Sequence, residues 1–286
     1  MRWPFLAAAI ATAAVALLAG PALAQSCGAP GAPCMVDDGT EDGGTYHFAL
    51  PEGPVRGVLL HLHGGGATGE GVIKGGTARG ALARGYAVIA PQGWHPANRY
   101  QKDWSVRAKN TSHARDDIGF LRIVMADVSA RHGVTTDRVL LSGFSRGGSM
   151  VWDIACQTPD LARGFAPVAG AFWDDLPAGC ERPVDLFHTH GWTDRVVPLE
   201  GRSFREGTVV QGDVWASLFI LRATNGCAKR QPETGSAEGE RWWRHWSDCE
   251  AGRIDLMLHP GGHSAPPGWI DAALDWFEAR LAEDAS

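Results

Sequence analysis

A serine flanked by glycines, in the segment Gly143-Phe144-Ser145-Arg146-Gly147, is the first feature of this chain that could do chemistry. The apolar run 138–142 before it predicts a buried strand, and the pattern at 150–154 after it predicts a helix. A sharp strand-to-helix turn of the G-x-S-x-G type lifts the serine hydroxyl clear of the backbone, while its glycines avoid collisions with neighbouring chain. Ser145 is therefore the predicted nucleophile of a covalent mechanism.

Such a serine needs a base, and the base needs an acid that orients it. Asp194 follows the apolar run 184–188, and His263 follows the apolar run 254–258. Both are therefore predicted on loops at the carboxyl edge of one sheet, in the order Ser, Asp, His that accompanies this kind of turn. We expect His263 to be the base and Asp194 the acid that orients it.

Other residues compete for these roles. His259 is the main rival of His263, but it falls at the end of the predicted strand, whereas Gly261 and Gly262 allow the loop before His263 to bend toward the serine. Three other carboxylates lie in or before strand 184–188 and are expected at the wrong edge of the sheet or in exposed loops: Asp174, Asp175 and Asp185.

A glycine-rich loop, His63-Gly64-Gly65-Gly66, follows the apolar run 58–62. Loops of this type donate a backbone N–H to the oxyanion of an acyl-transfer reaction, and glycines let the backbone approach the substrate oxygen. Gly65 is the first choice for this donor and Gly66 the alternative. The second predicted donor is the N–H of Arg146, at the start of the helix after Ser145.

Two His-x-His pairs, His61 with His63 and His188 with His190, offer a competing interpretation as metal ligands. Neither has a nearby carboxylate at a familiar ligand spacing, and we expect no metal site. Among the 12 tryptophans, Trp192 and Trp104 are placed to form walls of a substrate pocket. The cluster 242–246 is expected to pack under a predicted Cys227–Cys249 bridge, and shaping a cleft is the alternative.

The elements that must position these residues are short apolar runs alternating with amphipathic segments. The predicted strands are 58–62, 86–90, 138–142, 184–188 and 254–258, and the predicted helices cover 117–128, the segment after Ser145, and 269–281. Alternating strands and helices predict a mostly parallel sheet covered on both faces, the α/β class. Ligands of such sheets bind beyond the carboxyl ends of the strands.

The N-terminus has the three parts of a signal peptide: Arg2, an apolar run over 5–19, and small residues before Ala24. We expect cleavage after Ala24 and a single domain over 25–286, exported to the periplasm or beyond the cell without a membrane anchor. Removal of Arg2 leaves 25 Lys and Arg against 32 Asp and Glu. This negative balance argues against nucleic acid as a partner, and we expect a monomer.

Six cysteines in an exported chain predict three disulfides. The pairing of nearest neighbours, Cys27 with Cys34, Cys156 with Cys180 and Cys227 with Cys249, closes the shortest loops. Other pairings remain open, whereas a zinc site is disfavoured because no Cys-x-x-Cys occurs. The Gly-, Pro- and Asp-rich segment 25–44 has no apolar period and is expected to be a surface segment held by the first pair.

The chain resembles the secreted esterases known as polyhydroxybutyrate depolymerases, which are related to feruloyl and acetylxylan esterases. The matching segments are His63-Gly64, Pro91-Gln92-Gly93, 116–120, 137–139, the Ser145 turn, Ala155-Cys156, Pro159-Asp160, 166–170, His190-Gly191, Asp194, 225–227 and 261–263. The resemblance implies an α/β-hydrolase fold, no metal or organic cofactor, and the roles assigned above to Ser145, Asp194 and His263. Two positions depart from it: Arg146 stands where many members have Asn, and Gly65 where many have Cys.

The resulting hypothesis is a serine esterase that cleaves hydroxyalkanoate esters through an acyl-enzyme. Feruloyl or acetylxylan esterase activity is the alternative, and soluble oligomers are expected as substrates as readily as polymer, because no separate polymer-binding module follows the predicted domain. A serine peptidase with the same triad and a noncatalytic binding protein are the rivals from other classes. Cleavage of amides and failure to react with a fluorophosphonate, respectively, would distinguish them.

Overall fold

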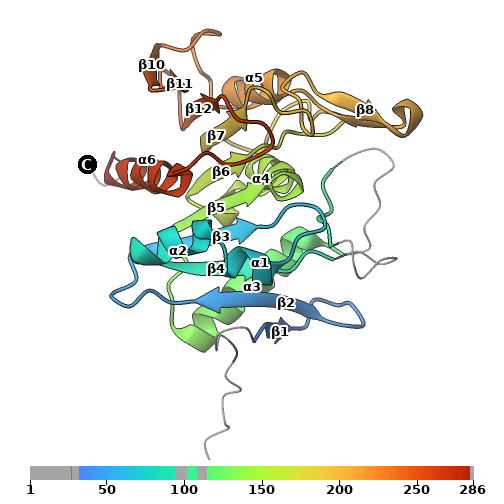
Figure 1. The fold of residues 1–286 in the computed structure, drawn as a ribbon, viewed down its shortest axis with the longest axis vertical. Helices are drawn as coiled ribbons and strands as arrows, with labels where there is room; N and C mark the ends of the chain where they lie inside the picture. The colour runs from blue at the N-terminus through green and yellow to red at the C-terminus, as the bar shows by residue number, and fades with distance from the viewer. Residues whose placement is uncertain (1–26, 28–31, 95–101, 108–114, 284–286) are drawn as a thin grey trace, which may run out of the picture.

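The computed structural model describes residues 27, 32–94, 102–107 and 115–283. The predicted signal peptide, residues 1–24, and its cleavage point lie outside these residues. A ten-stranded sheet runs through the molecule in the order β1-β2-β4-β3-β5-β6-β7-β12-β11-β10 (Figure 1).

The centre of this sheet is parallel. It consists of β3 (Gly57–Leu62), β4 (Tyr86–Pro91), β5 (Val139–Phe144), β6 (Gly164–Val168), β7 (Asp185–Gly191) and β12 (Arg253–His259). All adjacent pairs among them are parallel. The five predicted strands are confirmed within two or three residues at their ends, and β6 is an addition. The predicted α/β class with a mostly parallel sheet is confirmed.

Both edges of the sheet are antiparallel. On one side, β2 (Gly44–Ala49) pairs with β4, and β1 (Cys34–Val36) pairs with β2. On the other side, β11 (Arg241–Trp246) pairs with β12, and β10 (Thr234–Glu238) pairs with β11. The described part of segment 25–44 lies largely at the surface and is held by the Cys27–Cys34 bridge, as expected, but Cys34–Val36 also adds an edge strand that the sequence did not predict.

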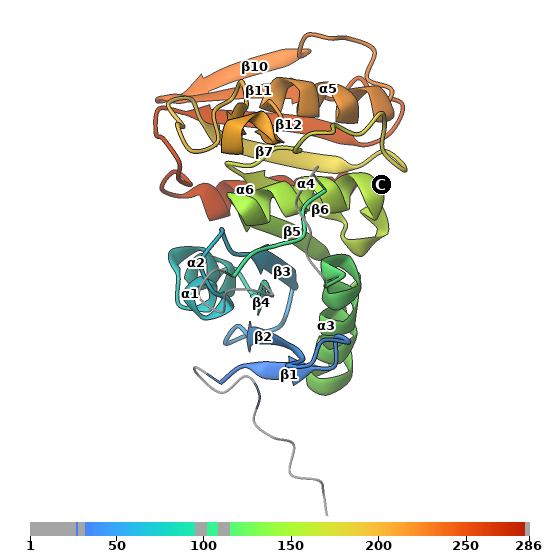
Figure 2. The same cartoon turned by 90° about the vertical axis from the view of Figure 1, so that its right-hand side faces the viewer.

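Helices cover both faces of the sheet (Figure 2). The helices α2 (Gly76–Ala83) and α6 (Trp269–Glu283) pack on one face, in a core that includes Leu59. The other face carries α3 (Asp117–His132), α4 (Arg146–Gln157) and α5 (Val214–Thr224), in a core that includes Leu60. Successive strand residues point to opposite faces, so the apolar residues 58–60 of β3 supply both cores.

The remaining elements are short. They are α1 (Gly69–Ile73) after β3, the 3₁₀ turns Pro159–Leu161 and Arg205–Gly207, and a separate hairpin of β8 (Arg202–Phe204) and β9 (Val209–Gln211). No helix within the described residues is long and apolar enough to cross a bilayer.

Three disulfides join Cys27 to Cys34, Cys156 to Cys180 and Cys227 to Cys249. The nearest-neighbour pairing is therefore confirmed. The second bridge ties the C-terminal turn of α4 to the segment before β7, and the third links the end of α5 to the turn that precedes β12.

Candidate active site

Ser145 occupies a sharp turn between β5, which ends at Phe144, and α4, which begins at Arg146. Its φ angle is +57°, a conformation that is uncommon for a residue with a side chain and that is held here by surrounding structure. The Ser145 N–H donates to the carbonyl of Val168 on β6, at 2.9 Å. Gly147 is required because a Cβ there would lie 2.5 Å from the His63 carbonyl oxygen. The predicted strand-turn-helix context of Ser145 is thus present.

The side chains of Ser145, His263 and Asp194 form a continuous hydrogen-bonded series. His263 Nε2 lies 2.8 Å from Ser145 Oγ, and His263 Nδ1 lies 2.7 Å from Asp194 Oδ2. A carboxylate only accepts, so the proton of the neutral ring sits on Nδ1 and leaves Nε2 able to accept from the serine hydroxyl. The structure therefore brings the three predicted residues together although 118 positions separate Ser145 from His263.

Asp194 is buried and held in place by its own loop. Its Oδ1 accepts hydrogen bonds from the N–H groups of Val196 and Val197, at 2.8 and 2.9 Å, which leaves Oδ2 for His263. The carboxylate is thus oriented before a substrate arrives. Asp185, the first residue of β7, starts at the opposite edge of the sheet, as expected.

His259, the rival base, has a different place. Its Nδ1 accepts the Gly261 N–H at 3.1 Å, and its Nε2 donates to the Ser264 carbonyl at 3.1 Å. The ring therefore bridges the two sides of the loop that carries His263. Burial lowers the pKa of His259, which keeps the ring neutral and both bonds intact near neutral pH.

The glycine loop lies directly beside Ser145: a Cβ on Gly64 would be 3.4 Å from the Cβ of Ser145. The N–H of Gly66 donates to the Lys102 carbonyl at 2.8 Å, so this alternative oxyanion donor is already engaged. The Gly65 N–H has no partner among the residues described. The Arg146 N–H belongs to the first turn of α4, directly after Ser145. Gly65 and Arg146 remain the candidate donors.

Comparison with known proteins identifies the family. A model of the Phospholipase/Carboxylesterase family matches residues 47–208, more than half of the chain. The chain belongs to this family. It is a carboxylic ester hydrolase with the α/β-hydrolase fold.

Individual relatives are distant. Feruloyl esterase C of Emericella nidulans is 25% identical over 249 residues, which cover 82% of this chain and 81% of the relative. NocK of Nocardia uniformis is 31% identical over 163 residues, but the match covers only 54% of this chain and 44% of NocK. The solved acetyl xylan esterase from Aspergillus awamori has the same fold, with a TM-score of 0.61 and 18% identity over 87% of this chain and 99% of that one.

The loop of this esterase that carries Gly65 is fixed by His63. The ring donates from Nδ1 to the Gly64 carbonyl at 2.7 Å, and its Nε2 accepts the N–H of Gly93 at 2.8 Å and the side-chain amide of Gln92 at 3.1 Å. Trp104 donates its indole N–H to the His63 carbonyl at 2.8 Å. Trp104 is fully buried, so the expectation that it forms a pocket wall is wrong. Trp104 supports the loop from behind.

Trp192 is half-buried in the loop before Asp194 and packs edge-on against Trp242, with ring centroids 5.0 Å apart. Trp242 is among the exposed large hydrophobic residues. By contrast, Trp243 stacks on Phe187 and Trp246 is buried. The expectation that the cluster 242–246 packs is thus met by these two tryptophans and not by Trp242. Trp192 and Trp242 together give the esterase an apolar surface close to the acid loop.

The His188–His190 pair lies behind Asp194. His188 Nδ1 donates to the Pro167 carbonyl at 3.1 Å, and His188 Nε2 lies 3.0 Å from His190 Nδ1. His190 Nε2 donates to the Val197 carbonyl at 2.7 Å. His190 Nε2 is also 3.5 Å from Asp194 Oδ2. All four ring nitrogens face protein groups, so the pair is built into the interior of the esterase.

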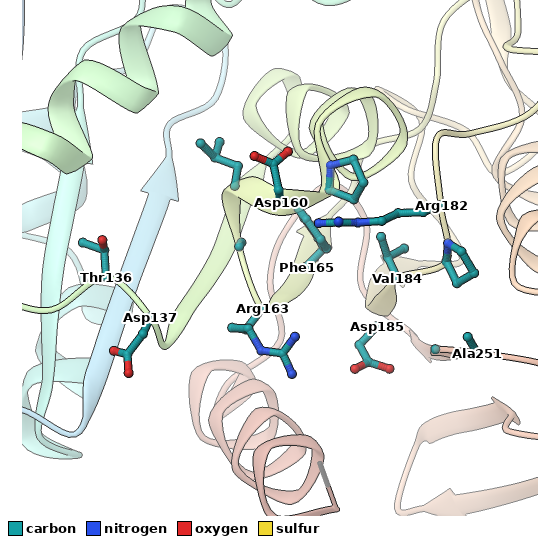
Figure 3. Close-up of a pocket in the computed structure, with 14 residues that line it drawn as sticks. Thr136, Asp137, Asp160, Arg163, Phe165, Arg182, Val184, Asp185 and Ala251 are labelled. Carbon is teal, nitrogen blue, oxygen red and sulfur yellow. The ribbon is translucent and has the colours of Figure 1, made fainter. Parts of the chain in front are cut away.

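A separate cavity of about 490 Å³ lies at the other edge of the sheet, where β6 and β7 begin (Figure 3). Acidic and basic side chains share its lining: Asp137, Asp160, Arg163, Arg182 and Asp185. It contains none of the residues around Ser145, and it has no part in the site.

Proposed function

We propose that Ser145 is the nucleophile of a carboxylic ester hydrolase, with His263 as the general base and Asp194 as its orienting acid. The observation that carries this proposal is the series of two hydrogen bonds, 2.8 Å from Ser145 Oγ to His263 and 2.7 Å from His263 to Asp194. Both distances lie in the range required for proton transfer and orientation.

In the proposed mechanism, His263 takes the hydroxyl proton as Ser145 Oγ attacks the ester carbonyl. The N–H groups of Gly65 and Arg146 stabilise the tetrahedral oxyanion, and His263 passes the proton to the departing alkoxide. Water, activated by His263, then attacks the acyl-enzyme and releases the acid. Asp194 holds the imidazolium in its orientation throughout.

For the substrate, we propose hydroxyalkanoate oligomer or polymer esters, as in polyhydroxybutyrate depolymerases. The segments that support this run from His63-Gly64 to 261–263 and cover most of the predicted mature chain, 25–286. Feruloyl or acetylxylan ester hydrolysis is the second candidate, because Feruloyl esterase C aligns with this chain over 82% of its length. We further propose that the enzyme is a monomer of one domain and that it is exported. The three disulfides support export, because such bridges are typical of oxidising compartments.

Labelling and a substrate panel test this proposal. A fluorophosphonate should attach to Ser145, located by mass spectrometry, and Ser145→Ala should abolish both labelling and hydrolysis of p-nitrophenyl butanoate. Rates on hydroxybutyrate oligomers, feruloyl and acetyl sugar esters, and matched amides then rank the substrates. A variant Ser145→Ala with full activity would refute the nucleophile, and preferential cleavage of amides would indicate a peptidase.

A further inference from the structure

A cavity of about 520 Å³ opens between the glycine loop after β3 and the loop that carries His263. Apolar side chains form most of its wall: Val72, Phe144, Val168, Ala265 and Trp269. Two of the rings that line it, His63 and His263, have both nitrogens engaged in the contacts described above. A ligand in this cavity therefore meets a largely apolar surface directly beside Ser145.

The lining also holds three hydroxyl side chains, Thr68, Thr77 and Ser264. His61 is the exception among the nitrogen-bearing rings. The side chain is buried, with 6% of its surface exposed, and its Nδ1 lies 2.6 Å from Ser142 Oγ. No described residue bonds its Nε2, and Nε2 is not among the enclosed polar atoms that lack a partner. Nε2 therefore retains access to the cavity that the ring lines.

The partner of Nδ1 decides what Nε2 can do. The Ser142 hydroxyl has no other hydrogen-bond partner among the described residues, so it is satisfied only if it donates to His61 Nδ1. The ring proton then sits on Nε2. Burial lowers the pKa of His61 to about 4, so the ring is neutral near pH 7 and offers a single N–H donor to the cavity.

The position of the cavity shows which part of an ester it would take. The lining includes His263 and the two residues after it, Ser264 and Ala265, but neither of the candidate oxyanion donors, Gly65 and Arg146. The departing oxygen must lie next to His263, since that ring protonates it as the bond from the acyl carbon to the oxygen breaks. The cavity thus lies on the side of the leaving alcohol.

We propose that this cavity binds the alcohol portion of the ester, and that this portion has a short aliphatic body and a carbonyl oxygen that accepts from His61 Nε2–H. This inference rests on the proposed function and narrows its substrate class. An ester of a hydroxyacid fits, because its next carbonyl follows within a few atoms of the broken bond. A sugar alcohol fits less well, because it carries several hydroxyls and those directed at Val72, Phe144 or Val168 would lose water without gaining a partner. The hydroxyl side chains of the lining, Thr68, Thr77 and Ser264, could serve only some of them.

The test compares butanoate esters of three alcohols: methyl β-hydroxybutyrate, a secondary hexyl alcohol of similar size without the carbonyl, and xylose. Release of butanoate gives kcat/KM for each. We expect the wild type to prefer the first ester over the second by about tenfold, the factor associated with one neutral hydrogen bond, and to act more slowly on the xylose ester.

In His61→Asn, the amide oxygen can still accept from Ser142 while the Nε2 donor is lost, so the ratio between the first two esters should fall to near one. Tyr46→Phe is the control, since it removes another partly buried hydrogen bond, from Tyr46 to Asp127 at 2.6 Å, and should keep the wild-type ratio. As a second variant, Val72→Phe should reduce hydrolysis of the branched esters relative to methyl butanoate, because it narrows the cavity.

A wild type that does not discriminate between the first two esters, a His61→Asn variant that keeps their ratio, or a preference for the xylose ester would overturn the assignment of the cavity while leaving the esterase proposal intact. Absence of butanoate release from every ester, together with no labelling of Ser145, would instead overturn the proposed function on which the assignment rests.

Discussion

The indole Nε1 of Trp104 donates a 2.8 Å hydrogen bond to the backbone carbonyl of His63, the residue that opens the glycine loop. The same carbonyl lies so close to α4 that only glycine fits at position 147. The two rings also pack against each other, with centroids 5.0 Å apart. A fully buried tryptophan thus fixes the start of the loop whose Gly65 N–H is a candidate oxyanion donor.

Replacement of Trp104 should therefore slow catalysis without greatly weakening substrate binding. In Trp104→Phe the ring remains but the hydrogen bond to His63 is lost, so the loop is held less firmly. Loss of a whole oxyanion donor costs about 10²–10³ in kcat, and we expect a displaced donor to cost roughly 10-fold to 100-fold. Steady-state kinetics on p-nitrophenyl butanoate should show this in kcat, with KM changed little.

The matched control is Trp276→Phe. Trp276 lies on α6, away from the glycine loop, and this substitution removes the 2.6 Å hydrogen bond from its indole to Asp255 on β12. It should lower stability without a comparable loss of kcat. Equal effects of the two substitutions on kcat would show that Trp104 acts only through general stability.

A second prediction separates the two histidines of the loop after β12. His263→Ala removes the proposed base and should lower kcat/KM by roughly 10⁴-fold or more. His259→Gln should cost much less, about 10-fold, because His259 only bridges Gly261 and Ser264. We would measure kcat/KM of the two purified variants in parallel at one pH. A larger loss of kcat/KM in His259→Gln than in His263→Ala would show that His259 is the base.

Much of the fold and of this site was predictable because the signals are local. β3, β4 and β5 consist mostly of apolar residues, and the segment around Ser145 carries its own turn glycines. The edge strand β1 escaped prediction because three residues are too short to show a period. β6 escaped because it contains Gly164 and Pro167, which are rarely found inside strands.

The roles of Trp104 and His61 could not be inferred in the same way. Trp104 lies in a segment without regular structure, and its partner His63 is 41 positions away. From the sequence, His61 is simply one residue of a predicted buried strand. Its free nitrogen becomes evident only when α1, Ser142 and Trp269 are placed around it. Such roles depend on contacts between distant segments, and local patterns carry no information about them.

A third prediction concerns Asp153, a buried carboxyl group on α4 whose Oδ2 accepts the Arg107 N–H at 2.6 Å. Burial raises the pKa of Asp153 to about 7, against the opposing effects of that hydrogen bond and of Arg146. Between pH 4 and pH 7 the folded protein therefore keeps a proton that the unfolded chain loses. The contribution of this group to the free energy of unfolding must fall as pH rises through that window.

Asp153→Asn removes the titrating carboxyl group and with it the loss of stability at higher pH. Relative to the wild type, the variant should gain stability progressively from pH 4 to pH 8, by up to about 4 kcal/mol, the equivalent of a shift of about three pKa units. Urea unfolding of both proteins at four pH values gives the difference between their free energies of unfolding. Other titrating groups are common to both proteins, so their contributions cancel in this difference. A difference that does not change with pH would contradict the elevated pKa.

The fourth prediction concerns the Cys156–Cys180 disulfide, which closes a loop of 24 residues. Chain entropy assigns a bridge of this length about 3 kcal/mol, so the double variant Cys156→Ala/Cys180→Ala should lose roughly that amount, or about 10 °C in the midpoint of thermal unfolding. Catalysis by this double variant should survive at low temperature.

Cys156 is 11 residues from Ser145 along α4, which at 1.5 Å per residue places the bridge about 16 Å from the turn. Calorimetry and kcat measured on the folded variant separate the two effects. A loss of kcat as large as the loss of stability would show that the bridge also sets the position of α4 at the site.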